Sequence, residues 1–239
     1  MNTEKLRIHH HHHMKTIYYS IAPAIFEKVP GYIRGLVVVR GADNSSSNTD
    51  VQSALRDAEK RLASAHTVET LLADARIASW REAFKLFGMN PSEFRPAHEA
   101  LARRAVQSKP LPFINALVDI GNTMSLARTL PVGVHPLDAV CGSLELRLAD
   151  GTENFIAFGW DKIERPKFGE VILTEDREVL TRAWVWRQGR GSVTLPASKA
   201  VVFNINMLPP VLEAQIEEIG LEIEFQIKKA CGGTTSRHL

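Results

Sequence analysis

Three polar side chains stand at helical spacing inside an otherwise apolar stretch, residues 111–133. Asn115, Asp119 and Asn122 are separated by four and three positions, so a helix would carry all three on one face. Small polar groups in an apolar helix need hydrogen-bond partners if they are buried. Either they cap turns and bond neighbouring backbone, or they line a pocket for a small molecule or nucleotide. The other side of the helix is expected to pack through Leu117, Ile120, Met124 and Ala127.

Residues 184–188 form a second segment that could take part in recognition, because they contain two tryptophans and a glutamine. On a strand, Trp184, Trp186 and Gln188 would share one face, with Val185 and Arg187 on the other. Such a row is typical of an aromatic pocket wall with one amide for recognition. Two large aromatic side chains on one strand face are more often core, so both interpretations stay open.

His135 lies beside a turn rich in proline and glycine, where a general base is possible in principle. No sequence neighbour offers it a catalytic partner, so a structural or surface histidine is the favoured interpretation. The chain has no glycine-rich phosphate loop, serine nucleophile elbow or zinc-ligand spacing. Cys141 and Cys231 are far apart and are expected to be reduced thiols. We therefore expect neither a metal nor a cofactor.

Composition sets limits on the class of protein. The 239 residues carry a formal net charge of +2, and 44% are hydrophobic and 23% charged. This allows a buried core but gives no chain-wide basic signature, so any RNA contact must come from a local patch. No apolar run is long enough to cross a membrane and no signal peptide precedes the first expected strand. A cytoplasmic protein without a membrane partner is expected.

The chain is expected to hold one domain between two dispensable ends. The histidine run from His9 to His13 indicates that residues 1–13 are an expression tag, with Met14 as the first native residue. Residues 14–231 would form the domain, and residues 232–239 a flexible tail.

Hydrophobic periodicity predicts helices in the middle of the chain and at its end, with strands between them. Apolar residues recur at steps of three and four in residues 49–62, 77–87 and 212–227, and a further helix is expected over residues 97–106. Strands are expected over residues 15–21, 36–39, 143–148, 155–158, 170–174, 179–186 and 200–207, with a hairpin turn at Asp150-Gly151. The predicted class is α+β, a mainly antiparallel sheet with helices packed on it.

Three motifs go further, because together they resemble the stand-alone B3/4-domain proteins. The first is WREAF at residues 80–84, followed by Gly88. The second is Arg95-Pro96 with EAL at 99–101 and two arginines at 103–104. The third is INALVDIGN at 114–122 with LPVG at 130–133, which is also similar to the editing domain of the phenylalanyl-tRNA synthetase β subunit.

The resemblance implies a B3/4 editing-domain-like fold and a trans-acting editing factor that hydrolyses the ester of mischarged tRNA. In the synthetase the domain acts on tRNA wrongly charged with tyrosine, and depends on a positioned water and the tRNA's terminal ribose hydroxyl. The partner here would be the aminoacylated acceptor end of tRNA, held by Arg81, Arg95, Arg103, Arg104 and Lys109, unless these form an ordinary solvated helix face. The aminoacyl ester would be bordered by Asn115, Asn122 and the turn from Pro131 to Gly133. Trp184, Trp186 and Gln188 would shape the amino-acid pocket, and Asp119 is also expected to bind the substrate.

Two positions depart from the synthetase pattern. The synthetase's histidine falls on Gly133, and its tyrosine-reading glutamate falls near Gly189. A buried recognition group discriminates by leaving unmatched polar groups unpaired, so tyrosine is not the expected substrate. Two alternatives stay open beside editing: a non-catalytic module that binds tRNA or an amino acid, and an enzyme that uses the same pocket for an unrelated small molecule.

Overall fold

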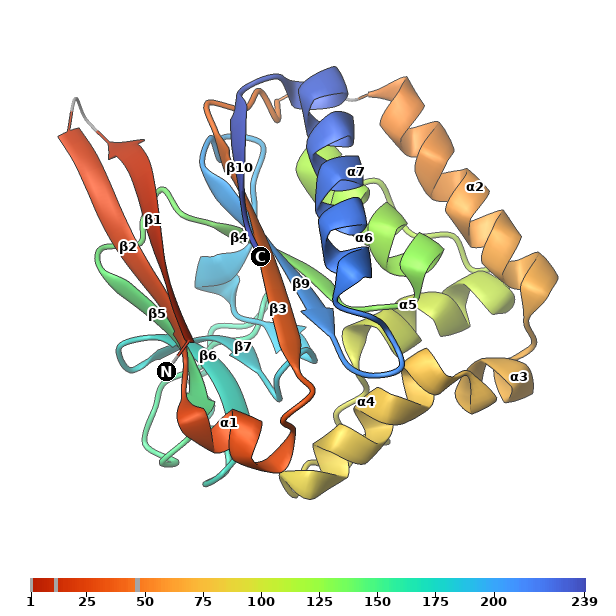
Figure 1. Ribbon diagram of the computed structural model, residues 1–239, viewed down its shortest axis with the longest axis horizontal. Coiled ribbons are helices and arrows are strands. Elements are labelled where there is room, and N and C mark those ends of the chain that lie inside the picture. The colour runs from red at the N-terminus through yellow and green to blue at the C-terminus, as the bar shows by residue number, and fades with distance from the viewer. Residues whose placement is uncertain (1, 11–12, 46–47) are drawn as a thin grey trace.

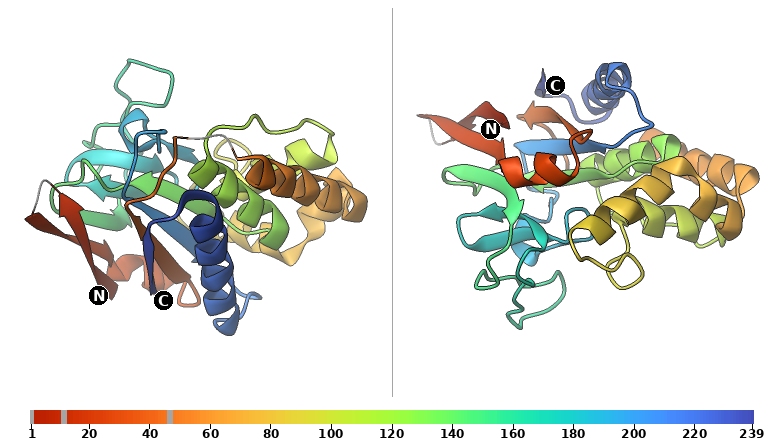
Figure 2. Two further views of the ribbon diagram at one scale, coloured as in Figure 1. Left: turned by 90° about the horizontal axis from the view of Figure 1, so that it is seen from above. Right: turned by 60° about the horizontal axis from the view of Figure 1, so that its bottom comes forward.

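Two β-sheets packed face to face, with helices covering the outer face of one of them, form the computed structural model of the protein (Figure 1 and Figure 2). It describes residues 2–10, 13–45 and 48–239. Its mixture of mainly antiparallel sheets and packed helices confirms the predicted α+β class.

The larger sheet has six strands in the order β1-β2-β5-β6-β7-β8. They are β1 (Asn2–His10), β2 (His13–Ile21), β5 (Ser143–Leu148), β6 (Val171–Glu175), β7 (Glu178–Arg182) and β8 (Arg187–Gln188). Strands β2 and β5 are parallel, and every other neighbouring pair is antiparallel.

The smaller sheet has four antiparallel strands in the order β10-β3-β9-β4. They are β3 (Ile33–Arg40), β4 (Val132–Pro136), β9 (Val201–Met207) and β10 (Thr234–His238). The apolar run from Leu36 to Val39 is buried throughout, as predicted for a strand covered on both faces. One face packs on the larger sheet and the other on helices.

Seven α-helices and one 3-10 helix are present in the described part of the chain. They are α1 (Pro23–Lys28), α2 (Thr49–Ala65), α3 (Val68–Ala73), α4 (Ala75–Leu86), α5 (Ala97–Val106), α6 (Ala116–Arg128), α7 (Ala214–Cys231) and η1 (Arg190–Ser192). Helices α6 and α7 cover the outer face of the smaller sheet, and α2 and α5 pack against α6 (Figure 1).

The helices form where the periodicity predicted them. In α7, Ile216, Ile219, Ile223 and Ile227 all face the smaller sheet and are buried. Each such side chain contributes roughly 1.5–3 kcal/mol relative to an exposed position. Helix α2 begins after Asn48, whose side chain accepts a hydrogen bond from the backbone N–H of Val51. These contacts fix the helical layer against the sheet.

Several predicted strands differ from the observed ones. The strand predicted over residues 179–186 ends at Arg182, because Ala183 and Trp184 have positive φ angles and turn the chain. Residues 155–158 make only isolated bridges, not a strand. Asp150-Gly151 is a turn, but β5 and β6 are joined by the long loop 149–170 and not by a two-residue hairpin.

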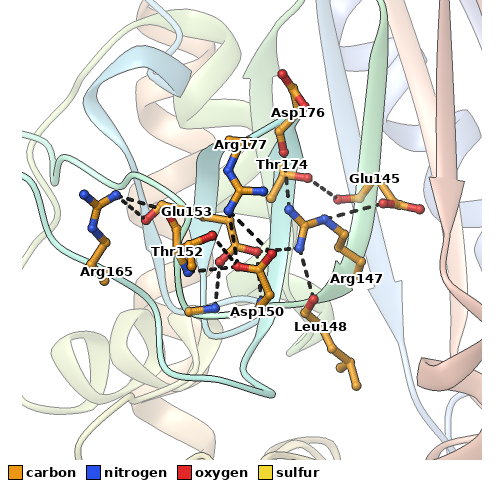
Figure 3. Close-up of polar contacts among 11 residues, drawn as sticks. Glu145, Arg147, Leu148, Asp150, Thr152, Glu153, Arg165, Thr174, Asp176 and Arg177 are labelled. Atoms are coloured by element: carbon orange, nitrogen blue, oxygen red, sulfur yellow. Dashed lines mark hydrogen bonds and ion pairs between the residues drawn. The ribbon is translucent and has the colours of Figure 1, made fainter.

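That loop is fixed by a buried carboxylate (Figure 3). Glu153 accepts hydrogen bonds from the backbone N–H groups of Asp150 and Gly151, each at 3.0 Å, and from Arg147 Nη1 at 2.5 Å. Arg177 also reaches Asp150 at the surface. The polar groups of this cluster are hydrogen-bonded or ion-paired to one another. The cluster therefore holds the loop in place and offers no free group for chemistry.

The predicted tail is wrong, because residues 234–238 form β10. This strand pairs with β3, whose edge backbone groups would otherwise lack partners. Thr235 and Arg237 also bond the Glu224 carboxylate of α7. The cause is long-range pairing, which local sequence does not reveal.

Residues 2–10 pair along the full length of β2, and Leu6 and Ile8 are buried in the core between the sheets. That residues 1–13 are an expression tag is a statement about origin and stays a prediction; residues 1, 11 and 12 lie outside the described residues.

Candidate functional site

A cavity of about 200 Å³ lies between the two sheets, beside α5 and α6. This is smaller than the ~300–1,000 Å³ typical of pockets for drug-sized ligands, so it suits a small group. Its wall includes six residues predicted from sequence: Asn122, Pro131, Gly133, Trp184, Trp186 and Gln188. Among the described residues that line it are two arginines and no aspartate or glutamate.

The three polar residues of α6 have separate roles. Asn115 is the N-cap: its Oδ1 accepts from Val118 N at 3.1 Å, and its Nδ2 donates to Thr194 O at 3.0 Å. Asp119 is buried, and its Oδ1 accepts from Ile114 N at 3.0 Å. Burial raises the pKa of this carboxyl. Both residues therefore hold the start of α6, and neither lines the cavity.

Asn122 is the one of the three that lines the cavity. It lies two turns beyond Asn115 and one turn beyond Asp119 along α6. The spacing predicted that all three residues would share one helical face. Asn115 instead caps α6 and lies outside the helix itself.

The two tryptophans do not share a strand face. The turn after β7 places Trp184 in the core, where its ring makes edge contacts with Tyr32 and Trp80, both at 5.0 Å between centroids. Trp186 is only partly buried and packs edge-on against Phe94 at 4.7 Å. The core and pocket interpretations both apply, because Trp184 fills the core and also borders the cavity.

The turn is held in an unfavourable conformation by a buried ion pair. Ala183 and Trp184 have φ of 44° and 60°, a region that costs on the order of 1–3 kcal/mol for a residue with a side chain. Glu170 compensates, because its carboxylate accepts from Ala183 N at 3.0 Å and pairs with Arg182 through both oxygens. Such conformations cluster at ligand sites.

His135 reaches the cavity from β4. Its Nδ1 lies 2.7 Å from Ser192 Oγ and 3.2 Å from Gln188 Nε2, which also donates to Val134 O at 2.9 Å. An amide nitrogen offers only hydrogens, so Nδ1 is the acceptor and the neutral ring carries its proton on Nε2. Burial lowers the pKa of His135 to about 4, which keeps the ring neutral near pH 7.

Gly133 leaves space for that imidazole. Gly133 and His135 are two positions apart on β4 and so lie on one face. A Cβ at position 133 would meet His135 Nε2 at 3.0 Å. Nε2 makes no hydrogen bond to any residue that the structure describes. The ring therefore occupies space that a side chain at position 133 would need.

Sequence reasoning missed a polar row on the inner face of the smaller sheet. Asn204 and Asn206 of β9 both line the cavity, and Tyr32 donates to Asn206 Oδ1 at 2.6 Å. Asn204 Nδ2 donates to the Tyr19 hydroxyl at 2.6 Å. Two asparagines at alternate positions of an apolar strand were the available signal, because they must share one face. Arg34 of β3 belongs to the same row.

The predicted RNA-binding arginines gather around one buried carboxylate. Arg81 Nε and Arg103 Nε lie 2.7 and 3.0 Å from the Glu99 oxygens, and Arg95 Nε lies 3.4 Å away. Three cations against one anion leave excess positive charge on this surface. Arg104 and Lys109 are exposed. Helix α5 borders the cavity through Ala97 and Leu101, so the positive surface adjoins its rim.

No group of three histidine, cysteine, aspartate or glutamate side chains suited to a metal ion occurs within residues 2–10, 13–45 and 48–239. Across the same described ranges, every helix is too short or too polar to traverse a bilayer. Cys141 is exposed and Cys231 is buried, and both are free thiols.

Comparison with known proteins identifies a family and a similar fold. The model of the family described as the B3/4 domain matches residues 79–227. The chain is also similar in structure to an N-terminal fragment of the phenylalanyl-tRNA synthetase β subunit from Pyrococcus horikoshii, with a TM-score of 0.50 and 10% sequence identity. The match covers 97% of this chain but 54% of that fragment, and at this identity it concerns the fold alone. It confirms the expected B3/4-type fold. No curated protein matches the sequence.

Proposed function

The chain belongs to the B3/4 domain family, and on that premise we propose that it hydrolyses the ester bond of mischarged aminoacyl-tRNA in trans. The observation that carries the proposal is the small cavity between the sheets, which Asn122, Gly133 and Gln188 line together. Its size suits an aminoacyl group, and its rim adjoins a positive surface on α5.

His135 is the group best placed to assist the reaction. Its Nε2–H would donate a hydrogen bond to the carbonyl oxygen of the ester, where negative charge develops as water adds to the carbon. A neutral imidazole suits that role, because a donor fixed in advance stabilises the oxyanion without reorganising. Gln188 and Ser192 hold the ring through Nδ1.

The chemical demands of this hydrolysis are modest. Water adds to the carbonyl carbon, the bond to the ribose oxygen breaks, and a proton passes to that oxygen to give free tRNA and the amino acid. The neighbouring ribose hydroxyl can orient the water, as the resemblance implies. The protein would contribute chiefly orientation and the oxyanion donor, and orientation alone can supply much of a rate.

Binding of the acceptor stem is assigned to the positive surface of α5. Arg104, whose Nη2 donates to Pro110 O at 2.9 Å, and Lys109, just beyond the end of α5, are exposed and form no ion pair with Glu99, so both can contact phosphates. Such contacts weaken steeply with salt, which would make the affinity for tRNA depend on ionic strength.

The test is to incubate the protein with a panel of mischarged tRNAs and to follow deacylation against a no-enzyme control. We expect turnover of at least one pair. His135→Ala should then lower the rate about 10²–10³-fold, and His135→Gln, which keeps an N–H donor, should lower it less. Absence of turnover on every pair by the folded protein would refute the proposal.

A non-catalytic binding module is the second candidate. It is favoured by the lack of any carboxylate in the described cavity wall, which leaves no evident general base. In the same panel, tRNA or amino-acid binding without hydrolysis would select this candidate, and hydrolysis above the control would eliminate it.

A further inference from the structure

Arg34 stands on the inner face of the smaller sheet with most of its hydrogen-bonding capacity unused. Its residue surface is 7% exposed, and it lines the cavity. Its guanidinium lies over the Tyr19 ring, with Cζ 4.1 Å from the ring centroid. Nη2 donates to Tyr19 O at 3.1 Å, and the buried Nη1 has no hydrogen-bond partner among the described residues.

No described carboxylate forms an ion pair with Arg34. Glu4 is the one acidic residue whose charge acts on it, but the Glu4 carboxylate lies 3.6 Å from His238 instead. The phenols of Tyr19 and Tyr32 stay neutral, because burial raises the pKa of both. A buried cation without a hydrogen-bonded partner is costly, since desolvation is not offset by a nearby anion.

The rest of the cavity adds positive charge and no negative charge. Arg187 is the second cation on the wall, and the described wall residues include no acid. Beside Arg34, the buried Oδ1 of Asn204 is an acceptor without a donor. An unused cation and an unused acceptor on the same sheet face suit a ligand with an anionic group beside an N–H donor.

We infer that the Arg34 end of the cavity binds a carboxylate, either the side-chain carboxylate of an acidic aminoacyl group or the α-carboxylate of a free amino acid. A planar guanidinium matches a carboxylate in shape and can donate two parallel hydrogen bonds. Arg34 and Asn204 both line the cavity. As a statement about the substrate of hydrolysis, this inference rests on the proposed function.

Calorimetric titration with three small probes distinguishes the two sources. L-Glutamate carries both carboxylates, L-glutamine only the α-carboxylate, and L-isoglutamine (the α-amide of glutamate) only the side-chain carboxylate. Binding of L-isoglutamine assigns Arg34 to the side chain of an aminoacyl ester, and binding of L-glutamine assigns it to the α-carboxylate. Either result supports the inference if it depends on Arg34.

Arg34→Met removes the charge and keeps the length, and we expect it to weaken binding of the preferred probe about 10- to 100-fold. Arg34→Lys should retain part of the affinity. Lys60→Met removes an exposed positive charge on α2 and serves as the matched control. We expect Arg34→Met to melt at or above the wild-type temperature, because an uncompensated buried cation is lost. A melt of each variant shows that it is folded.

The inference is overturned if no probe binds at concentrations up to ~10 mM, or if Arg34→Met binds as well as the wild type. Equal competition by inorganic phosphate would also overturn the assignment to a carboxylate. Deacylation of neutral aminoacyl-tRNAs without Arg34-dependent binding of any probe would refute this inference and support the proposed function. Arg34-dependent binding with no deacylation of any pair would refute the proposed function and support the carboxylate site.

Discussion

Replacing Asn115 by alanine should destabilise the protein without damaging its chemistry. Two contacts disappear: the cap on Val118 N at 3.1 Å and the donor to Thr194 O at 3.0 Å. Loss of an N-cap costs about 0.5–2 kcal/mol. A buried acceptor left unpaired costs about 1–3 kcal/mol, and Thr194 is 1% exposed.

Together these effects give a loss of about 1.5–5 kcal/mol in the free energy of unfolding. For a chain of this size, that corresponds to a fall of roughly 3–20 °C in melting temperature. The measurement is thermal and urea-induced unfolding, followed by circular dichroism. Asn122→Ala is the matched control on the same helix, because the Asn122 side chain lines the cavity and makes no hydrogen bond to any described residue. Its unfolding free energy should change by less than about 0.5 kcal/mol.

Activity should show the reverse order. At a temperature where both variants are folded, Asn115→Ala should deacylate mischarged tRNA at nearly the wild-type rate, and Asn122→Ala should be slower. If Asn115→Ala loses its activity while its melting temperature is unchanged, the assignment of Asn115 to capping is wrong.

Three further predictions follow from the same geometry. Burial lowers the pKa of His98 and of His135 to about 4. Between about pH 6.5 and 4 the unfolded chain therefore binds more protons than the folded one, so the free energy of unfolding should fall as the pH drops through that window. A His98→Gln, His135→Gln double variant should show a flatter pH profile in urea titrations. Gly133→Ala places a Cβ 3.0 Å from His135 Nε2, so deacylation should slow by about tenfold or more in single-turnover assays while the melting temperature stays close to wild type. Joint replacement of Arg104 and Lys109 by alanine should weaken tRNA binding and lower its salt slope by about 1–2 in filter-binding assays; an unchanged slope would remove these residues from the interface.

Local pattern predicted the elements that carry their own signal. The helix expected over residues 97–106 is α5 with the same bounds, and the alternating strand 143–148 is β5. In β5 the alternating leucines Leu144 and Leu146 are the buried ones, whereas the buried face of α5 also contains the polar residues His98 and Glu99. Where burial depends on a distant partner, the pattern gave no guide: β10 exists because β3 has an open edge, and β4 is short and rich in glycine and proline.

The site was predicted in part for the same reason. Asn122, Gly133 and Gln188 were found because they stand out in their segments, and the structure brings them to one cavity. Arg34 was missed because a single arginine in a strand gives no sign of its partners. The absence of a carboxylate beside Arg34 depends on residues from eight strands in two sheets, and no window of sequence contains them together.

The relation between Gly133 and His135 bears on how relatives of this chain should be compared. Side chains at positions i and i+2 of a strand point to the same face, and their Cα atoms are only about 7 Å apart. A ring at one position can therefore reach toward the space above the other. Column-by-column alignment would record only a glycine at position 133, although His135 Nε2 lies 3.0 Å from where a Cβ at that position would stand. Comparisons across the family should therefore ask which atoms reach a given point in the cavity, and not which letter stands in a given column.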